Sequence, residues 1–166
     1  ANEAGVNAGR AAFNAPRFTV SSGGLTVGAG NINGAIDSMP GLYGGTIGLT
    51  GLGFANVATN FGSDTYDSTG AGRNGIEVIY SMGDFGVHVS NSSTSNIDRT
   101  ALSVSYAVSG WTLALGYQDS NRAADAEWVA TVGGALGAAN VGLAVSQTHA
   151  GVNSMTLSGS FSVGAA

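Results

Sequence analysis

The residues of this sequence that could do ionic chemistry are a few aspartates and arginines. Three aspartates, Asp37, Asp64 and Asp67, fall within one glycine-rich stretch, residues 32–73. Of the five arginines, Arg17 comes before this stretch, Arg73 is its last residue and Arg99 comes after it. If the two sets faced each other across a narrow space, they would form a strongly charged site. The alternative is that the aspartates serve turns, where Asp is common, and that the arginines are solvated. The sequence leaves both interpretations open.

The other side chains with possible chemistry are few. Asp64 and Asp67 could contribute oxygen ligands to a calcium ion, but they lack the spacing of a defined calcium loop. The absence of cysteine excludes thiolate catalysis and thiolate metal sites. We therefore predict no metal site and no cofactor, with calcium as a weak alternative.

Histidine and glutamate are too scattered to indicate an enzyme. His88 and His149 lie far apart in the chain, which favours a structural or surface-lining role over metal binding or catalysis. Glu77 and Glu127 fall on different expected strands, and nothing suggests the closeness that acid-base catalysis needs. The stretch GAGNING lacks the lysine of a phosphate-binding loop. We predict that the chain is not an enzyme.

Composition excludes one further class of protein. Only 9% of the residues are charged, against about 25% in an average soluble domain, and 28 of the 166 residues are glycine. There is no lysine, the formal net charge is -5 and the pI is near 4.6. Because nucleic-acid binding needs a basic face, we exclude nucleic acid as a partner.

The elements that would position these residues are strands. In WTLALGYQ, residues 111–118, large apolar side chains alternate with small or polar ones, which is typical of a strand because successive side chains point to opposite faces. The same alternation recurs along the chain and predicts about nine strands. Helical spacing is nowhere convincing, and no stretch is long enough for a membrane-spanning helix. The fold class is all-β.

The connections between these strands alternate in length. Tight turns are expected at residues 22–24, 83–84, 109–110 and 137–138. Longer polar links are expected at residues 91–98, 119–125 and 149–153. Such alternation favours an up-and-down antiparallel sheet with tight turns at one end and long loops at the other. The link at 32–73 is too long for an ordinary connection, and such a loop usually has a function of its own.

The side chains on the two faces of the strands indicate what each face meets. In a soluble barrel the exterior would be covered by Ser, Thr, Gly and Ala, a poor soluble surface. If the large apolar residues instead meet lipid, the small polar ones line a water-filled lumen, and Glu77 and His88 point into it. Aromatic residues near the strand ends would form interfacial girdles; these are Tyr80, Phe85, Tyr106, Trp111, Tyr117, Trp128 and Phe161. On this interpretation Leu115→Arg disrupts the wall, whereas Ala114→Arg is mild.

Three stretches carry a resemblance to a known family. GLTVGAGNINGAIDS, SDTYDSTGAGRNGIEVIYS and GDFGVHVS resemble the general diffusion porins of alphaproteobacteria, the Rhodobacter type, from about residue 13 to residue 166. The resemblance implies a transmembrane barrel of sixteen strands, of which this chain is an interior portion with about nine. It also implies a homotrimer in the bacterial outer membrane, with lipid and lipopolysaccharide around it and small hydrophilic solutes and ions passing through.

The same resemblance assigns roles to two segments. Residues 1–12 correspond to a remnant of the second external loop, and residues 32–73 to the third, which folds into the barrel and narrows the pore. The aspartates and arginines named above would then line a constriction. The alternative class is a secreted or surface-exposed glycine-rich β-structured adhesin, which should show a fixed repeat period; none is evident.

Overall fold

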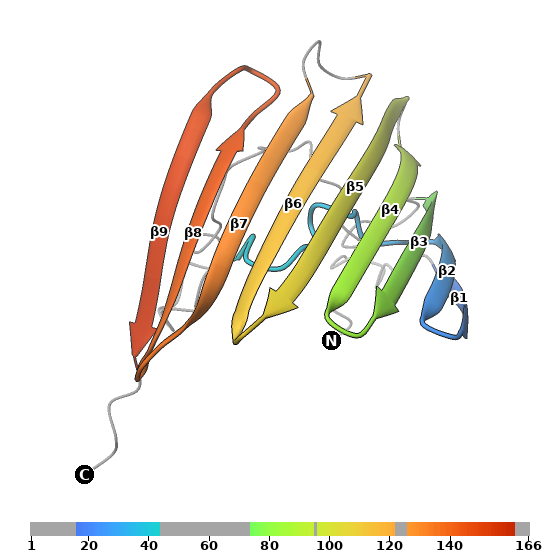
Figure 1. The fold of residues 1–166 in the computed structure, drawn as a ribbon. Helices are drawn as coiled ribbons and strands as arrows, with labels where there is room; N and C mark the ends of the chain where they lie inside the picture. The colour runs from blue at the N-terminus through green and yellow to red at the C-terminus, as the bar shows by residue number, and fades with distance from the viewer. Residues whose placement is uncertain (1–15, 44–73, 95, 122–125, 162–166) are drawn as a thin grey trace, which may run out of the picture.

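The computed structural model describes residues 16–43, 74–94, 96–121 and 126–161, and these contain nine strands. Their bounds are β1 Arg17–Ser22, β2 Leu25–Gly30, β3 Asn74–Met82, β4 Phe85–Thr94, β5 Ile97–Val108, β6 Trp111–Ser120, β7 Glu127–Leu136, β8 Ala139–Gln147 and β9 Asn153–Phe161. The strands form one sheet in chain order, and each is antiparallel to the next (Figure 1). The predicted up-and-down antiparallel sheet of about nine strands is confirmed. No helix among the described residues is long and apolar enough to cross a membrane.

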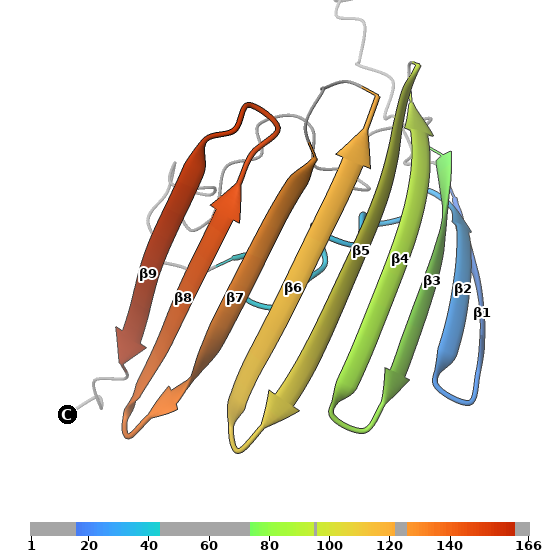
Figure 2. The same ribbon diagram turned by 45° about the horizontal axis from the view of Figure 1, so that its top comes forward.

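Two-residue turns join the strands in pairs at one end of the sheet (Figure 2). They follow β1, β3, β5 and β7, as the tight-turn pattern predicted. Ser109 and Gly110 show why these turns form, since both have positive φ, 50° and 80°. A two-residue hairpin turn whose twist matches the strands needs this conformation, which glycine adopts at little cost.

At the opposite end, one predicted loop is wrong. Residues 91–98 are not a long link, because β4 and β5 stay paired as far as Thr94 and Ile97. The polar side chains here extend the hairpin instead of ending it: the Asn91 amide donates to the Thr100 hydroxyl at 3.0 Å and to the Arg99 carbonyl at 3.3 Å. Polarity alone is therefore a poor signal for a loop where cross-strand side chains bond to each other.

The two faces of the sheet differ as the alternation predicted. Leu115 on β6 is 64% exposed, while its neighbour Ala114 is 3% exposed. The exposed face carries Leu, Val, Ile, Met and aromatic side chains from every strand, and the opposite face carries mainly Ser, Thr, Gly, Ala and a few ionisable residues. We call these the outer face and the inner face.

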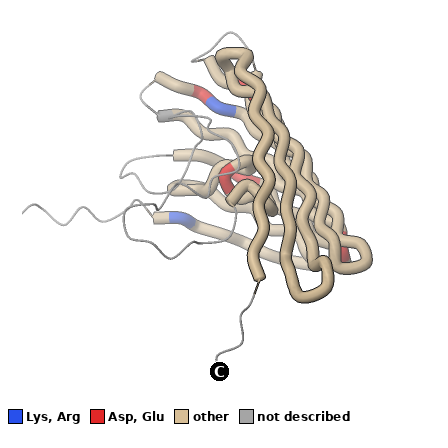
Figure 3. The backbone as a smooth tube through the Cα atoms, turned by 90° about the vertical axis from the view of Figure 1, so that its left-hand side faces the viewer, with Lys and Arg blue, Asp and Glu red and all other residues tan. Residues whose placement is uncertain are grey.

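The sheet is curved, and residues 31–43 lie on its concave side (Figure 3). That side is the inner face, because the buried side chains of residues 31–43 pack there with Ala101, Ala114 and Val129. In Figure 1 the same segment passes behind the strands at about half their height. The buried core of the described chain is therefore a thin layer between one segment and the wall, not the centre of a closed sandwich.

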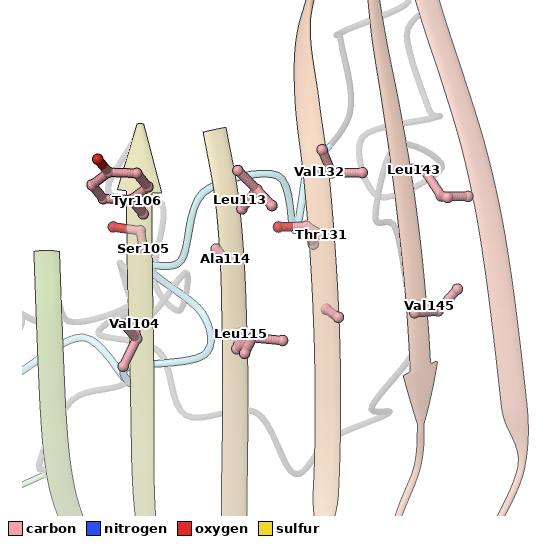
Figure 4. Close-up of a pocket in the computed structure, with 11 residues that line it drawn as sticks. Val104, Ser105, Tyr106, Leu113, Ala114, Leu115, Thr131, Val132, Leu143 and Val145 are labelled. Atoms are coloured by element: carbon pink, nitrogen blue, oxygen red, sulfur yellow. The ribbon is translucent and has the colours of Figure 1, made fainter. Parts of the chain in front are cut away.

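A shallow apolar depression of about 370 Å³ lies on the outer face (Figure 4). Its cause is visible in the strand register, in which Ala130 on β7 lies between Leu115 on β6 and Val145 on β8. A methyl group between two longer aliphatic side chains leaves a furrow along β7. Tyr106, Leu113 and the other lining residues come from β5, β6, β7 and β8.

The position of Ala114 overturns one expectation from the sequence. Arginine at Ala114 was expected to be mild because the residue faces inward, but its side chain is buried against residues 31–43. A long charged side chain has no space there. Ser105 is a better inward-facing reference, because it pairs with Ala114 across β5 and β6 and is only partly buried.

We predict that Leu115→Arg destabilises the folded chain in lipid by about 2–4 kcal/mol, the cost of a cationic side chain on the lipid face near the midplane. Ser105→Arg, at a neighbouring position on the inner face, should cost less than about 1 kcal/mol, an order-of-magnitude figure for a position near water. Urea unfolding in lipid vesicles measures both. Equal unfolding midpoints for the two variants would show that the faces are wrongly assigned.

Candidate functional site

Residues 31–43 cross the inner face from β3 to β7, and backbone hydrogen bonds hold the start of this segment. The backbone N–H of Asn31 donates to the Pro16 carbonyl at 3.1 Å, and the backbone N–H of Ala35 donates to the Ser90 hydroxyl at 2.9 Å. Ile32 lies over Gly75, where an added methyl group would stand 2.6 Å from the isoleucine Cδ1. The wall is thus hollowed by small residues where the segment enters.

The middle of the segment is seated on β6 and β7. A Cβ at Gly116 would lie 2.7 Å from the Met39 sulfur and 3.1 Å from Ile36 Cγ1, so only glycine leaves space for these side chains. The Thr131 hydroxyl donates to the Pro40 carbonyl at 2.7 Å. One side of the segment is therefore locked to the wall by apolar packing and by a hydrogen bond.

The segment is amphipathic. Its buried apolar side chains are Ile32, Ala35, Ile36, Met39 and Leu42, a spacing close to that of one helical face. Asp37 and Tyr43 are more exposed, and the Tyr43 hydroxyl donates to the Asp37 carboxylate. The segment consequently presents apolar groups to the wall and polar groups to the space on its other side.

A buried carboxylate lies on the inner face at the β1 side of the sheet. Glu77 on β3 forms an ion pair with Arg17 on β1, and its second oxygen lies 3.2 Å from His88 Nε2 on β4. β2 lies between, and it contributes Gly28, whose missing side chain provides the space for the Glu77 carboxylate. Three side chains thereby join β1, β3 and β4 across β2.

A second buried carboxylate lies further along the sheet. Glu127 on β7 accepts a hydrogen bond from the Gln118 amide at 2.9 Å, and its other oxygen lies 2.9 Å from His149 Nδ1. His149 belongs to the connection between β8 and β9. Each inward-facing glutamate therefore has a histidine partner, which the wide sequence separation of His88 and His149 gave no reason to expect.

The residues predicted to form a constriction are only partly described. Arg17, Asp37 and Arg99 are on the inner side of the sheet, and among the described residues Arg17 forms an ion pair with Glu77. Arg99 is buried on β5. Asp64, Asp67 and Arg73, and with them the calcium alternative, lie outside the described residues, as do residues 1–12 and 44–73. Within the described ranges no three His, Asp or Glu residues are grouped to hold a metal ion.

The aromatic residues predicted to form girdles lie on the outer face, at two levels. Tyr117 and Trp128 face each other across β6 and β7 near the end opposite the tight turns. The others lie towards the tight turns: Tyr80, Phe85, Tyr106, Trp111 and Phe161. Between the levels the outer face is aliphatic.

Sequence reasoning missed the wall glycines and the packing of Ile32 and Met39 against them. Gly28 and Gly116 look like any other glycine in a glycine-rich chain, and their role depends on which residues lie opposite them in space. One signal was present: residues 32, 35, 36, 39 and 42 repeat at helical spacing inside a predicted loop, which indicates a segment that packs on a surface.

Comparison with known proteins identifies the fold. The sequence matches no family model and no curated protein. Three solved structures of mutants of Rhodopseudomonas blastica porin are similar over 91% of this chain, with TM-scores of 0.68, 0.66 and 0.66 and identities of 22%, 23% and 23%. This chain spans 58% of the length of each of those porin chains. The fold is that of part of a porin β-barrel wall.

We predict that Gly28→Ala destabilises the chain by about 1–3 kcal/mol, because the new methyl group displaces the buried Glu77 carboxylate from its partners. Gly133→Ala is the matched control, since its methyl group would meet the Val141 carbonyl oxygen at 3.4 Å and Gly142 Cα at 3.8 Å, which are ordinary van der Waals contacts. Urea unfolding midpoints in lipid vesicles compare the two. A control as damaging as Gly28→Ala would mean that the space around Glu77 is unimportant.

Proposed function

We propose that this chain forms part of an outer-membrane porin, a water-filled channel through which small hydrophilic solutes and ions diffuse. The observation that carries the proposal is the combination of an apolar outer face with an inner face of small polar residues crossed by residues 31–43. A structural similarity to a porin supports the same conclusion. We propose a channel and assign no catalytic step.

The outer face suits a bilayer because its exposed side chains are mostly apolar. Leu157 on β9 is 80% exposed, and the described strands expose similar side chains at most outward positions between the aromatic levels. If this face were exposed to water, it would be an extensive hydrophobic surface, which soluble monomers rarely carry. In lipid the same face needs no cover, and the interfacial aromatic residues would lie at the headgroup level.

The inner face suits water and a passing solute. Most of its side chains are short, so a barrel closed around it would keep an open lumen. Residues 31–43 occupy part of that space, and we propose that they belong to the constriction formed by residues 32–73. Permeation is then limited by solute size, and larger solutes are excluded.

We place the complete protein in the bacterial outer membrane, as a homotrimer surrounded by lipid and lipopolysaccharide. The support is the resemblance of the sequence to Rhodobacter-type porins together with the structural similarity to a porin. The outer face offers the apolar area that both lipid and neighbouring subunits require. Chemical crosslinking in native membranes, followed by electrophoresis, tests the trimer; crosslinked species that stop at a dimer would contradict it.

We predict that unseating the segment enlarges the pore. In Ile36→Ser/Met39→Ser, the two side chains that lie over Gly116 lose most of the burial that holds the segment, each worth about 1.5–3 kcal/mol. In the full-length protein, single-channel conductance in planar bilayers should rise, and liposome swelling should admit larger sugars.

The matched control is Leu113→Ser/Leu115→Ser, the same kind of change on the outer face of β6. It should leave conductance and the size limit unchanged. An unchanged conductance in Ile36→Ser/Met39→Ser, with folded channels still present, would mean that residues 31–43 do not limit the passage.

We also predict weak cation selectivity at low salt, since acidic residues outnumber basic ones by ten to five and Asp37 lies on the inner side. The preference, measured as a reversal potential, should shrink between about 0.1 M and 1 M salt because the Debye length falls from about 10 Å to about 3 Å. Asp37→Asn should weaken it, whereas Asp84→Asn, in a tight turn, should not. Anion selectivity at low salt would contradict the prediction.

A further inference from the structure

One aromatic side chain departs from the distribution of all the others that the structure describes. The outer face holds Phe18, Tyr80, Phe85, Tyr106, Trp111, Tyr117, Trp128 and Phe161. Tyr43 is the exception among the described aromatic residues, because it lies at the end of the segment that crosses the inner face. Its position cannot be explained by a lipid interface.

Tyr43 is exposed although the residue before it is buried. Leu42 is 1% exposed and packs in the layer between the segment and the wall, whereas Tyr43 is 44% exposed. Tyr43 therefore keeps far more contact with solvent than the side chains that seat the segment. Aromatic surface that is left in contact with water costs free energy, so a solute that covers it gains free energy.

The tyrosine is also held in place. Its hydroxyl donates to the carboxylate of Asp37, six residues earlier in the chain. The backbone between them is anchored by the hydrogen bond from Thr131 to the Pro40 carbonyl, at 2.7 Å. A ring whose position is fixed in advance loses little conformational entropy when a ligand stacks on it, which favours binding.

The hydroxyl end of the ring meets a charged group, because the Asp37 carboxylate accepts its hydrogen bond. An aromatic ring with a carboxylate at its polar end matches a ligand that has one apolar face and a rim of hydroxyl groups. A pyranose sugar has this shape, because its ring carbons present C–H groups on one face while its hydroxyls project from the edge.

Resting on the proposed channel function, we propose that Tyr43 is a stacking site for pyranose sugars inside the channel. The site distinguishes solutes of similar size by shape: a cyclic sugar stacks on the ring, whereas an open-chain polyol presents no continuous C–H face. Asp37 is a positioning residue that holds the ring. Transit of a pyranose therefore includes a brief bound state, in addition to the size limit set by the segment.

The test is single-channel recording on the full-length protein in planar bilayers, with methyl β-D-glucopyranoside or sorbitol as the probe. The pyranoside should block the ion current with an apparent affinity about two- to tenfold above that of sorbitol, the range expected for stacking on one aromatic ring. Tyr43→Leu should abolish this difference. Tyr43→Phe should retain most of it, because the ring remains, and Tyr43→Trp should increase it.

Tyr106→Leu is the matched control, since it makes the same substitution on the outer face. It should leave the difference between pyranoside and sorbitol unchanged. Equal block by the two probes in the unaltered protein, or an undiminished difference in Tyr43→Leu, overturns the proposal. Loss of the difference in Tyr106→Leu overturns it too. A protein that forms no channels at all refutes the proposed function instead, so the two failures are distinguishable.

Discussion

The close contact between residues 31–43 and the small side chains of the inner wall is the constraint on which the rest of the structure depends. Ile36 and Met39 can approach β6 only because position 116 is glycine, and a single methyl group there would stand inside van der Waals contact. Ala101 and Ala114 on the neighbouring part of the inner face also have short side chains, which leave space for the segment. Small inner-wall residues thus have two consequences: they leave space on the concave side of the sheet, and they allow one segment to lie flat against it.

Buried charge imposes a second constraint on the same wall. The carboxylates of Glu77 and Glu127 are almost entirely shielded from solvent, and an unpaired buried carboxylate costs several kcal/mol. Each is offset by two partners from other parts of the sheet: Arg17 and His88 for one, Gln118 and His149 for the other. The Arg17–Glu77 ion pair links β1 to β3, two strands that share no direct ladder, and His149 ties the connection between β8 and β9 to β7, whereas His88 and Gln118 lie on strands next to their glutamates.

Much of the sheet could be predicted from sequence, because alternation and turn chemistry are local. WTLALGYQ indicates a strand from eight residues, and Ser109-Gly110 indicates its turn from two. What sits over a given wall position is not local. The alternation in its own strand predicts that Ala114 faces the lumen. It is buried because Ile36, Met39 and Leu42, from a distant part of the chain, pack in the same cluster. The partners of Glu77 and the role of Gly28 could not be predicted for the same reason, and the polar stretch 91–98 misled because its side chains bond across the hairpin.

Strand direction limits how this wall can be completed. Neighbours in the sheet are antiparallel, so β1 and β9, both odd in order, run in the same direction. Joined directly to each other, these two edges would have to pair in parallel. A closed antiparallel barrel needs an even number of strands, so a barrel that includes the described nine would need an odd number of further strands. Sixteen, the number that the porin resemblance implies, meets this condition. In such a barrel the backbone N–H and C=O groups along β1 and β9 form hydrogen bonds to further strands. Lipid offers no hydrogen-bond partners, and each unpaired backbone group in it would cost several kcal/mol.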